Sequence, residues 1–245
     1  MAETKSCLVE KLSRYAPLSE RDLERLATLE EEERPCPRGS DVHRAGDRNG
    51  DLFVLKAGWA FSFTNMPDGR RQIVTVHHPG DVIGFPDIAF RNATTTLRCV
   101  DDVTLCPFPK SALSVILRES PRLSALMLSI ALRDQVVFID LLRAMGRMSA
   151  RERIAHMLLD FRARLRMTDP AVTDRFRLPL TQQQIADYLG ITNVYVSRTM
   201  IQMEDEGEIV RSEGHITLRD ASKLERLTDF CDRYADMDTS WFPDT

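Results

Sequence analysis

Residues 181 to 206 carry the side chains whose types and spacing are best suited to recognising another molecule. The segment reads TQQQIADYLGITNVYVSRTMIQMEDE, and Gly190 divides it into two stretches with helical periodicity. Thr181 and Thr192 stand where the two helices need N-terminal caps. The inward, apolar positions are then Ile185, Ala186, Leu189, Val196, Met200 and Met203, with Ile191 filling the core between the helices. The outward positions are Asn193, Val194, Tyr195, Ser197 and Arg198.

Arg198 has the chemistry for reading a nucleic-acid base, because a guanidinium can donate two hydrogen bonds to O6 and N7 of guanine. Such a contact is worth about 1–3 kcal/mol of discrimination. Small Ala186, a turn at Gly190 and apolar Val196 are what two helices need to cross closely in a helix-turn-helix. The run EIVRSEGHITLRD predicts two short strands around Glu213-Gly214, a wing. We therefore interpret the motif as a winged helix-turn-helix that contacts double-stranded DNA, with a plain helix pair or a protein-binding winged module as the alternative.

Composition limits how the chain can bind nucleic acid. The formal net charge is −4 and the pI is near 5.8, so basic surface does not coat the protein and any DNA contact must be local. No run approaches the roughly 18 apolar residues of a membrane helix, and we expect a cytoplasmic protein with no membrane partner. The five cysteines have no C-x-x-C spacing, which argues against a disulfide framework or a zinc site. No catalytic constellation is present, so we predict neither an enzyme nor a metal site.

The elements that must position the motif predict an α+β fold. Residues 5 to 32 predict short helices with a cap at Ser19, and residues 35 to 109 predict about eight short strands. A long helix from Ser120-Pro121 to Gly146 has the 4-3 spacing of a two-stranded coiled coil. Gly146 is interpreted as a hinge before a capping box that begins at Ser149. The predicted seam consists of Leu123, Met127, Ile130, Asp134, Val137, Leu141, Ala144 and Met148.

The 245 residues exceed the usual size of one domain, and we predict three parts. Residues 1–118 form an N-terminal sensor domain of short helices and strands. Residues 119–147 form a dimerisation helix, although a helix packed on its own β-domain is the alternative. Residues 148–245 form the winged helix-turn-helix domain with a C-terminal tail.

The whole pattern resembles the CRP/FNR family of transcription regulators. The β-rich N-terminal part, the heptad helix, the capped hinge helix and the text LPLTQQQIADYLGITNVYVSRTM carry the resemblance, which covers nearly the whole chain and is nearest to a FixK-like or related branch. It implies an N-terminal β-roll like that of cyclic-nucleotide-binding domains, a homodimer formed by the long helix, and a second motif helix in the major groove. The dimer would bind roughly palindromic promoter sites, with half-sites about one DNA turn apart, and would contact RNA polymerase.

The resemblance also implies roles for individual residues of the motif. The positions that would read bases are Asn193, Val194, Ser197 and Arg198, and those that would contact phosphates are Gln182, Thr192 and Tyr195. Better-known members carry glutamate where this chain has Val194, so their operator sequence cannot be carried over. A valine could contact a thymine methyl group instead.

The family's cyclic-nucleotide pocket can be compared with this sequence residue by residue. Gly80-Asp81 or Gly84 could match the glycine that holds the ribose. Ala93-Thr94, however, stands where an arginine pair binds the phosphate, and Phe138-Ile139 replaces the hydroxyl pair that binds the base. A buried phosphate without its counter-charge is unfavourable by on the order of several kcal/mol. We therefore predict an N-terminal domain whose signal is not cAMP.

Other signals stay open in the sequence. Arg91 and Arg98 could serve a shifted phosphate site, whereas Cys7 and Cys36 are too far apart for the family's iron–sulfur arrangement. His77-His78 could ligate haem, but a histidine pair in a turn is expected to face solvent. No cofactor is assigned. A haem- or redox-sensing regulator, a cyclic-nucleotide-gated regulator and a ligand-binding signalling module are the alternative functions.

Overall fold

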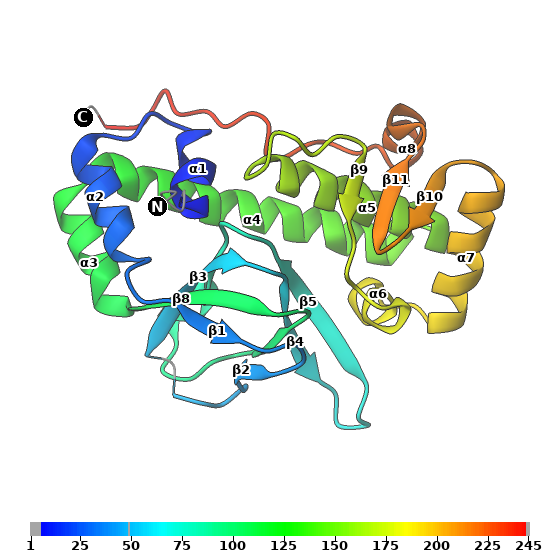
Figure 1. Cartoon of the computed structure of the whole chain (residues 1–245), viewed down its shortest axis with the longest axis horizontal. Coiled ribbons are helices and arrows are strands. Elements are labelled where there is room, and N and C mark those ends of the chain that lie inside the picture. The colour runs from blue at the N-terminus through cyan, green and yellow to red at the C-terminus, as the bar shows by residue number, and fades with distance from the viewer. Residues whose placement is uncertain (1–5, 49, 244–245) are drawn as a thin grey trace. The chain divides into compact units, whose positions relative to one another are not determined.

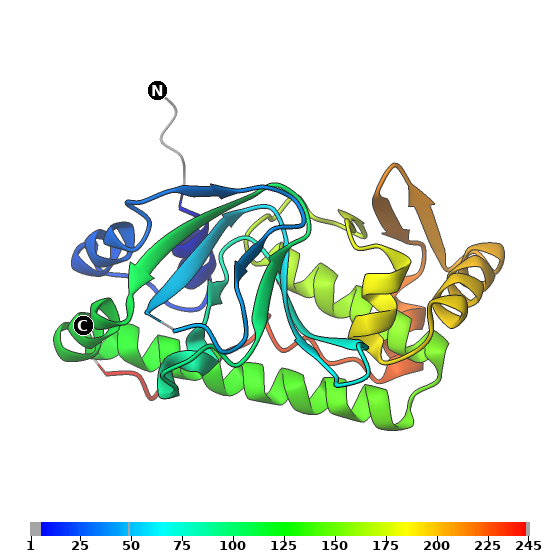
Figure 2. The ribbon, with the colours of Figure 1, turned by 90° about the horizontal axis from the view of Figure 1, so that it is seen from below.

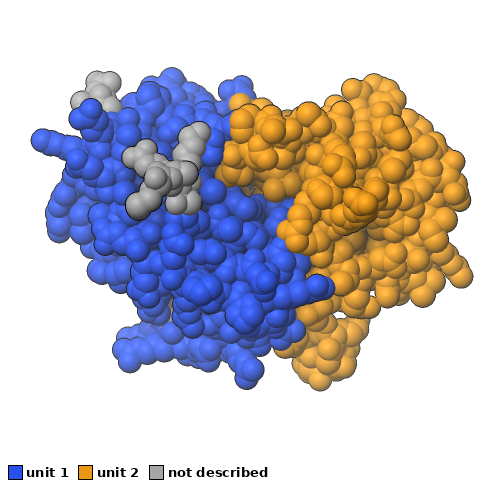
Figure 3. Space-filling model, in the orientation of Figure 1, with its two compact units in different colours: residues 1–64, 74–133, 236–245 blue, residues 65–73, 134–235 orange. Residues whose placement is uncertain are grey.

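The protein is described by a computed structural model that covers residues 6–48 and 50–243. The chain separates into two compact units, which are coloured in Figure 3. Unit 1 comprises residues 1–64, 74–133 and 236–245, and unit 2 comprises residues 65–73 and 134–235.

Unit 1 begins with two short helices that are capped by serines. Helix α1 (Cys7–Ser13) follows Ser6, whose hydroxyl accepts a hydrogen bond from the backbone of Val9 at 3.0 Å. Helix α2 (Glu20–Thr28) follows Ser19, and Ser19 and Asp22 satisfy each other's backbone N–H in a capping box. The predicted cap at Ser19 is confirmed.

The predicted number of about eight strands is confirmed, and the strands form two four-stranded sheets (Figures 1 and 2). One sheet has the order β1-β8-β3-β6 and the other β2-β7-β4-β5, with antiparallel pairing of β3 with β8 and of β4 with β7. A core cluster draws buried residues from both sheets, among them Leu55, Leu97 and Leu105, each 0% exposed. The strands are β1 (Arg34–Cys36), β2 (Asp41–His43), β3 (Asp51–Ala57), β4 (Ala60–Asn65), β5 (Arg71–His77), β6 (Val82–Ile83), β7 (Thr96–Cys99) and β8 (Val103–Pro109).

The histidine pair differs from the sequence expectation. His77 closes strand β5 and His78 follows it, and both are buried, His78 to 1% exposure. His78 packs edge-on against Trp59, with ring centroids 4.2 Å apart, and the Ser62 hydroxyl lies 2.8 Å from Nε2 of His77. The expectation of a solvent-facing pair was wrong because Trp59 covers His78 and Ser62 contacts His77, so that both rings are buried.

Two consecutive helices follow the strands. Helix α3 (Lys110–Glu119) was not predicted, because it follows strand β8 with no turn residue between them. Helix α4 (Pro121–Arg147) begins at the predicted proline and continues through Gly146. The break between this helix and the next therefore lies at Met148-Ser149, where the capping box of the next helix begins, rather than at Gly146.

The most exposed apolar residues of α4 lie on another face than the predicted seam. Leu123 and Ala144 of the predicted seam are buried within the chain, at 1% and 2% exposure. Both faces satisfy a 4-3 spacing, so the spacing alone could not identify the outer one. The apolar residues that face solvent are Leu128, Leu132, Val136, Phe138, Ile139 and Leu142. Four of these, Leu128, Leu132, Ile139 and Leu142, continue a 4-3 pattern through Gln135, and we call them the outer α4 stripe.

Unit 2 contains the helix-turn-helix and its wing (Figure 1). A three-stranded sheet has the order β10-β11-β9, so the predicted two-stranded wing gains a third strand, β9, which precedes the helix-turn-helix in the chain. The elements are α5 (Ala150–Arg166), β9 (Arg175–Arg177), α6 (Gln182–Leu189), α7 (Asn193–Asp205), β10 (Ile209–Ser212), β11 (His215–Leu218) and α8 (Ala221–Thr228). The predicted capping box from Ser149 to Glu152 is present at the start of α5.

The segment after α8 leaves the helical path at Asp229, which adopts a left-handed conformation with φ +49°. We call residues Asp229–Ala235 the C-terminal strap. Arg233 pairs with Asp140 of α4 at 2.9 Å, and the Tyr234 hydroxyl donates to Asp160 of α5 at 2.8 Å. The strap thus connects two helices that are joined to each other near Ser149. None of the helices in the described part of the chain has the length and apolar content that crossing a bilayer requires.

Candidate nucleic-acid interface

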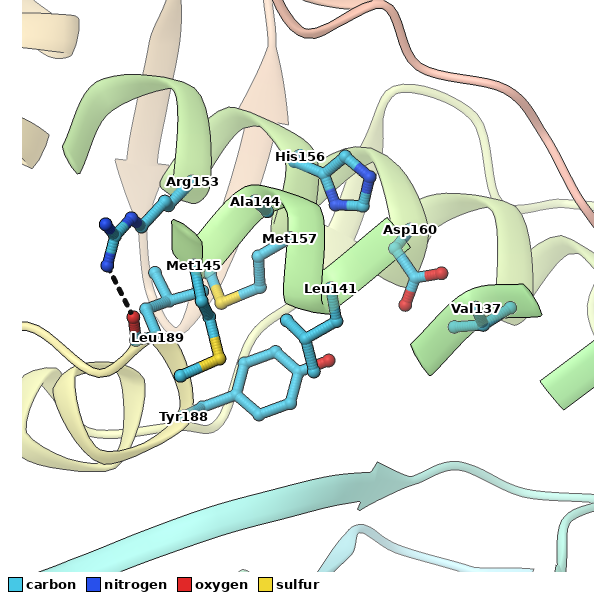
Figure 4. Close-up of a pocket in the computed structure, with 10 residues that line it drawn as sticks. All are labelled: Val137, Leu141, Ala144, Met145, Arg153, His156, Met157, Asp160, Tyr188 and Leu189. Atoms are coloured by element: carbon cyan, nitrogen blue, oxygen red, sulfur yellow. Dashed lines mark hydrogen bonds between the residues drawn. The ribbon is translucent and has the colours of Figure 1, made fainter. Parts of the chain in front are cut away.

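Helix α6 is fixed at its start by a capping box and at its end by side chains from other elements. Thr181 accepts from the backbone of Gln184 at 3.2 Å, and the Gln184 side chain accepts from the backbone of Thr181 at 2.7 Å. At the other end, the carbonyl of Leu189 accepts from Arg153 at 3.2 Å (Figure 4). Gln72 likewise donates to the carbonyl of Tyr188 at 3.1 Å. The helix is therefore held at both ends, which gives its N-terminus a defined place.

The turn between α6 and α7 requires glycine. Gly190 has φ +64°, and a Cβ added there would lie 2.9 Å from the Met145 side chain. The predicted role of Gly190 in the turn is thus explained by its left-handed backbone angle, whereas the Met145 methyl group at the end of a flexible side chain could shift. Ile191 is half-buried beside it, so it fills the core only in part.

Helix α7 presents most of the predicted outward residues on one exposed surface. Thr192 caps the helix by accepting from the backbone of Tyr195 at 3.3 Å. Val196, Met200 and Met203 are at most 2% exposed, so the inward face is the predicted one. Asn193, Val194, Tyr195 and Arg198 are exposed and Ser197 is half-buried, while Gln182 is half-buried in the first turn of α6.

One exposed apolar residue of α7 was not among the predicted site residues. Ile201 is 49% exposed, compared with 58% for Val194. It lies seven residues after Val194 and three after Arg198, so helical periodicity places all three along one line of the helix. The same periodicity that selected Arg198 would have found Ile201 if it had been continued for one more turn.

Two acidic residues near the C-terminal end of α7, Glu204 on the helix and Glu208 just after it, are paired with basic groups. Glu208, only 3% exposed, accepts from Arg151 at 3.1 Å and pairs with Lys223 at 2.9 Å. Burial alone would raise the pKa of Glu208, but the hydrogen bonds from these two cations outweigh it and the pKa is lowered. Glu204 accepts from the backbone of Arg211 at 3.0 Å and from its guanidinium, which lowers the pKa of Glu204. Arg198, in contrast, forms no ion pair with any of the residues that the structure describes.

A groove of about 280 Å³ lies between the wing and the start of α6. Its polar lining includes the side chains of Gln182, Arg211 and His215, and its floor includes Ile185 of α6 and Met200 of α7. The groove therefore lies beside the N-terminus of α6, where backbone N–H groups are available to an anion.

The junction of α4, α5 and α6 is closely packed (Figure 4). A cavity of only about 10 Å³ remains there, which is enough for roughly one water molecule. Val137, Leu141, Ala144 and Met145 of α4 line it opposite His156, Met157 and Asp160 of α5, with Arg153 at the start of α5 and Tyr188 and Leu189 of α6 completing it. Burial in this junction lowers the pKa of His156 and raises that of Tyr188.

The residues predicted for an effector pocket lie in different units. Gly80, Asp81, Gly84, Ala93 and Thr94 belong to unit 1, whereas Phe138 and Ile139 belong to unit 2, where both are exposed on α4. The polar side chains of the unit 1 residues form hydrogen bonds or ion pairs with their neighbours. The buried Asp81 carboxylate pairs with Lys11 and accepts from the backbone of His78 at 2.9 Å.

The place of the expected phosphate-binding pair holds a carboxylate. Asp87, 4% exposed, accepts from the backbone N–H of Thr94 at 3.1 Å and from the Thr94 hydroxyl at 2.5 Å. Thr94 thus uses both of its donors on a buried anion. The absence of an arginine at Ala93-Thr94 is visible in the sequence, but the role of Asp87, six residues before Ala93, is not.

The cysteines are mostly interior. Cys36, Cys99 and Cys106 are buried and Cys231 is exposed. Burial raises the pKa of the Cys106 thiol to about 11, so this thiol forms little of the reactive thiolate at neutral pH.

Two protein families match successive parts of the chain. Residues 33–120 match the cyclic nucleotide-binding domain family, which spans the strands of unit 1 and α3. Residues 152–227 match the Crp-like helix-turn-helix domain family, which ends one residue before the end of α8. The C-terminal strap lies after the matched region.

Several characterised proteins are similar to the chain over most of its length. The nitrogen fixation regulation protein FixK of Bradyrhizobium diazoefficiens is 37% identical over 189 residues, which are 77% of this chain and 78% of FixK. The transcriptional activator protein FnrL of Cereibacter sphaeroides is 30% identical over 214 residues, 83% of this chain and 84% of FnrL. The structure of FixK2 from Bradyrhizobium japonicum superposes with a TM-score of 0.72 at 25% identity, covering 80% of this chain and 96% of that one.

Proposed function

The chain belongs to the CRP/FNR family of transcription regulators, and on this premise we propose that it acts as a homodimer on roughly palindromic promoter sites under a signal other than cAMP. The exposed surface of α7 carries this proposal. Residues 1–118 would sense the signal, residues 119–147 would form the dimer, and residues 148–245 would bind DNA. The DNA-bound dimer would contact RNA polymerase.

The proposed base contacts are made by Asn193, Val194, Ser197 and Arg198. Their support is that all four lie in the first half of α7, three of them exposed, and that Arg198 has no ion-pair partner among the described residues. A guanidinium that is not neutralised within its own chain is available for a guanine O6 and N7.

The proposed phosphate contacts are made by Gln182, Thr192 and Tyr195. Gln182 lies in the first turn of α6 and Thr192 caps α7, so both stand at helix N-termini, where the helix dipole favours an anion. Tyr195 is 60% exposed, and its hydroxyl can donate to a phosphate oxygen. The pairing of Glu204 and Glu208 with Arg211, Arg151 and Lys223 supports the same orientation, since it reduces repulsion between this helix and DNA.

The proposed dimer is formed by the outer α4 stripe. Leu128, Leu132, Ile139 and Leu142 are between 49% and 71% exposed, and their spacing fits a two-stranded coiled coil. Burying these side chains against a second copy would remove a large apolar surface from water. A Leu142→Glu variant is expected to sediment as a monomer, whereas Leu117→Glu on α3, exposed to 65%, is the matched control that stays dimeric.

The buried carboxylate of Asp87 is expected to exclude cAMP. A cyclic phosphate at the position of Ala93-Thr94 would meet a buried carboxylate instead of a guanidinium, and it would find the donors of Thr94 already in use. Two anions brought together in a site with little water repel strongly. The signal is therefore of another chemical class, or the regulator is controlled by its own abundance.

Selection of bound sequences from random DNA tests the proposed function. A homodimer is expected to enrich an inverted repeat whose half-sites are about 10 base pairs apart, with a guanine in each half. Binding is expected to be the same with and without added cAMP. Failure to enrich any sequence would contradict the proposal.

A further inference from the structure

Three residues form one exposed line along α7. Val194 and Ile201 are 58% and 49% exposed, and Arg198 lies between them. At a rise of about 1.5 Å per residue, Val194 lies about 6 Å before Arg198, and Ile201 about 4.5 Å after it. The line therefore presents an aliphatic side chain, a guanidinium and a second aliphatic side chain in succession.

The next residue on this line ends the apolar surface. Asp205 is four residues after Ile201 and is exposed. A carboxylate at this position would repel DNA phosphates, so the part of the line that can approach DNA runs from Val194 to Ile201. This part is about 10.5 Å long, which corresponds to about three steps of base pairs.

The chemistry of the line identifies what it can contact in DNA. Aliphatic side chains cannot donate or accept hydrogen bonds, and the distinctive apolar group on a base edge in the major groove is the C5-methyl group of thymine. An arginine placed between them selects guanine. The line is complementary to a guanine that has a thymine on each side, within about two base pairs.

We propose that Ile201 is a further specificity-determining residue and that Val194 and Ile201 each contact one thymine methyl group beside the guanine bound by Arg198. This inference rests on the proposed function. It deepens that function because it states which base property the apolar residues read.

Deoxyuridine substitution tests the inference, because it removes the methyl group and leaves every hydrogen-bonding group of the base in place. A site selected by the wild-type protein from random DNA would be resynthesised with deoxyuridine in place of each thymine in turn. At two positions flanking the guanine, affinity is expected to fall about fourfold, the value that corresponds to one buried methyl group. Fluorescence anisotropy at fixed salt would measure the affinity.

Two variants assign each methyl group to its residue. Val194→Ala is expected to remove the deoxyuridine effect at one position only, and Ile201→Ala at the other. Leu227→Ala is the matched control, since Leu227 is an exposed aliphatic residue of α8 in the same unit and its loss should leave both effects unchanged. Thermal unfolding would verify that the variants fold, which their exposure predicts.

The outcomes separate this inference from the proposed function. If the wild-type protein selects a specific site but deoxyuridine changes its affinity less than twofold at every thymine, the inference is wrong and the proposed function stands. The same conclusion follows if Ile201→Ala keeps both deoxyuridine effects. If no site is selected at all, the proposed function itself fails, and the inference fails with it.

Discussion

Two regions of the molecule use their polar groups differently. On the outer face of α7, Arg198 makes no ion pair with the described residues, whereas in the segment of residues 80 to 94 the side chains of Asp81, Asp87 and Thr94 bond to neighbours within unit 1. An interface that must bind a partner keeps its donors available, and a site that has lost its ligand can satisfy its donors internally. This difference is the basis of our proposal that the chain retains one binding surface of its family while its own side chains fill another.

The largest effect is expected from a substitution on the outer face of α7. Arg198→Ala should weaken binding to the selected site by about 1–3 kcal/mol, or roughly five- to 150-fold, and relax the preference for guanine at one position of each half-site. Competition with single-base variants of the site would measure both effects.

Arg226→Ala is the control for Arg198, because Arg226 is an exposed arginine of α8 in the same unit. Its loss removes one positive charge without touching α7. Full site-specific binding by Arg198→Ala would break the comparison, since it would mean that an available guanidinium on this face has no role.

The next effect is expected from a substitution in the segment of residues 80 to 94. Asp87→Ala removes a buried carboxylate that accepts two hydrogen bonds from Thr94, and it should lower the free energy of unfolding by about 1–3 kcal/mol. It should not create cAMP binding, because no arginine replaces Ala93. Denaturant unfolding and calorimetric titration with cAMP would measure these quantities.

Asp51→Ala is the matched control for Asp87, because Asp51 is an exposed aspartate at the start of β3. Its removal should change stability by no more than a few tenths of a kcal/mol, roughly. Heat released by cAMP binding to the wild-type protein would contradict the idea that the site is closed.

The smallest effect extends the comparison to two histidines whose pKa is lowered by burial, the half-buried His43 of unit 1 and the buried His156 of unit 2. Burial lowers the pKa of His43 and of His156, so the folded state favours their neutral forms. The unfolded chain then binds more protons below its ordinary histidine pKa, and stability that is complete above about pH 6.5 is lost as the pH falls, by up to about 1.4 kcal/mol per pH unit for each histidine. Unfolding at a series of pH values between about 7.5 and 5.5 would show the slope.

The share of each histidine can be separated. His156→Gln should reduce the slope because it removes the group in unit 2, and His43→Gln should do the same for unit 1. A wild-type slope that neither variant reduces would assign the pH dependence to other groups.

The local chemistry of the motif could be predicted from sequence because each signal and its partner lie within a few residues. Thr181 with Gln184, Thr192 with Tyr195, and Ser149 with Glu152 are pairs of this kind. The inward residues Val196, Met200 and Met203 follow from helical periodicity alone. These features need no knowledge of the rest of the fold.

The features that were missed depend on contacts between distant residues. Whether Leu123 or Leu128 of α4 is buried is decided by what packs on the helix, and the 4-3 spacing is the same for both faces. His78 is buried because Trp59, nineteen residues earlier, lies against it. Asp87 was missed because its significance comes from the hydrogen bonds to Thr94 and not from a motif.

The C-terminal strap has a consequence for the synthesis of the protein. Asp140 and Asp160 leave the ribosome long before their partners, because Arg233 and Tyr234 follow them by 93 and 74 residues. Helices α4 and α5 are thus translated and exposed while the residues that join them are still to be made. The two contacts of the strap can therefore form only after nearly all of unit 2 has been translated, whereas the apolar packing of α4 on α5 does not wait for them.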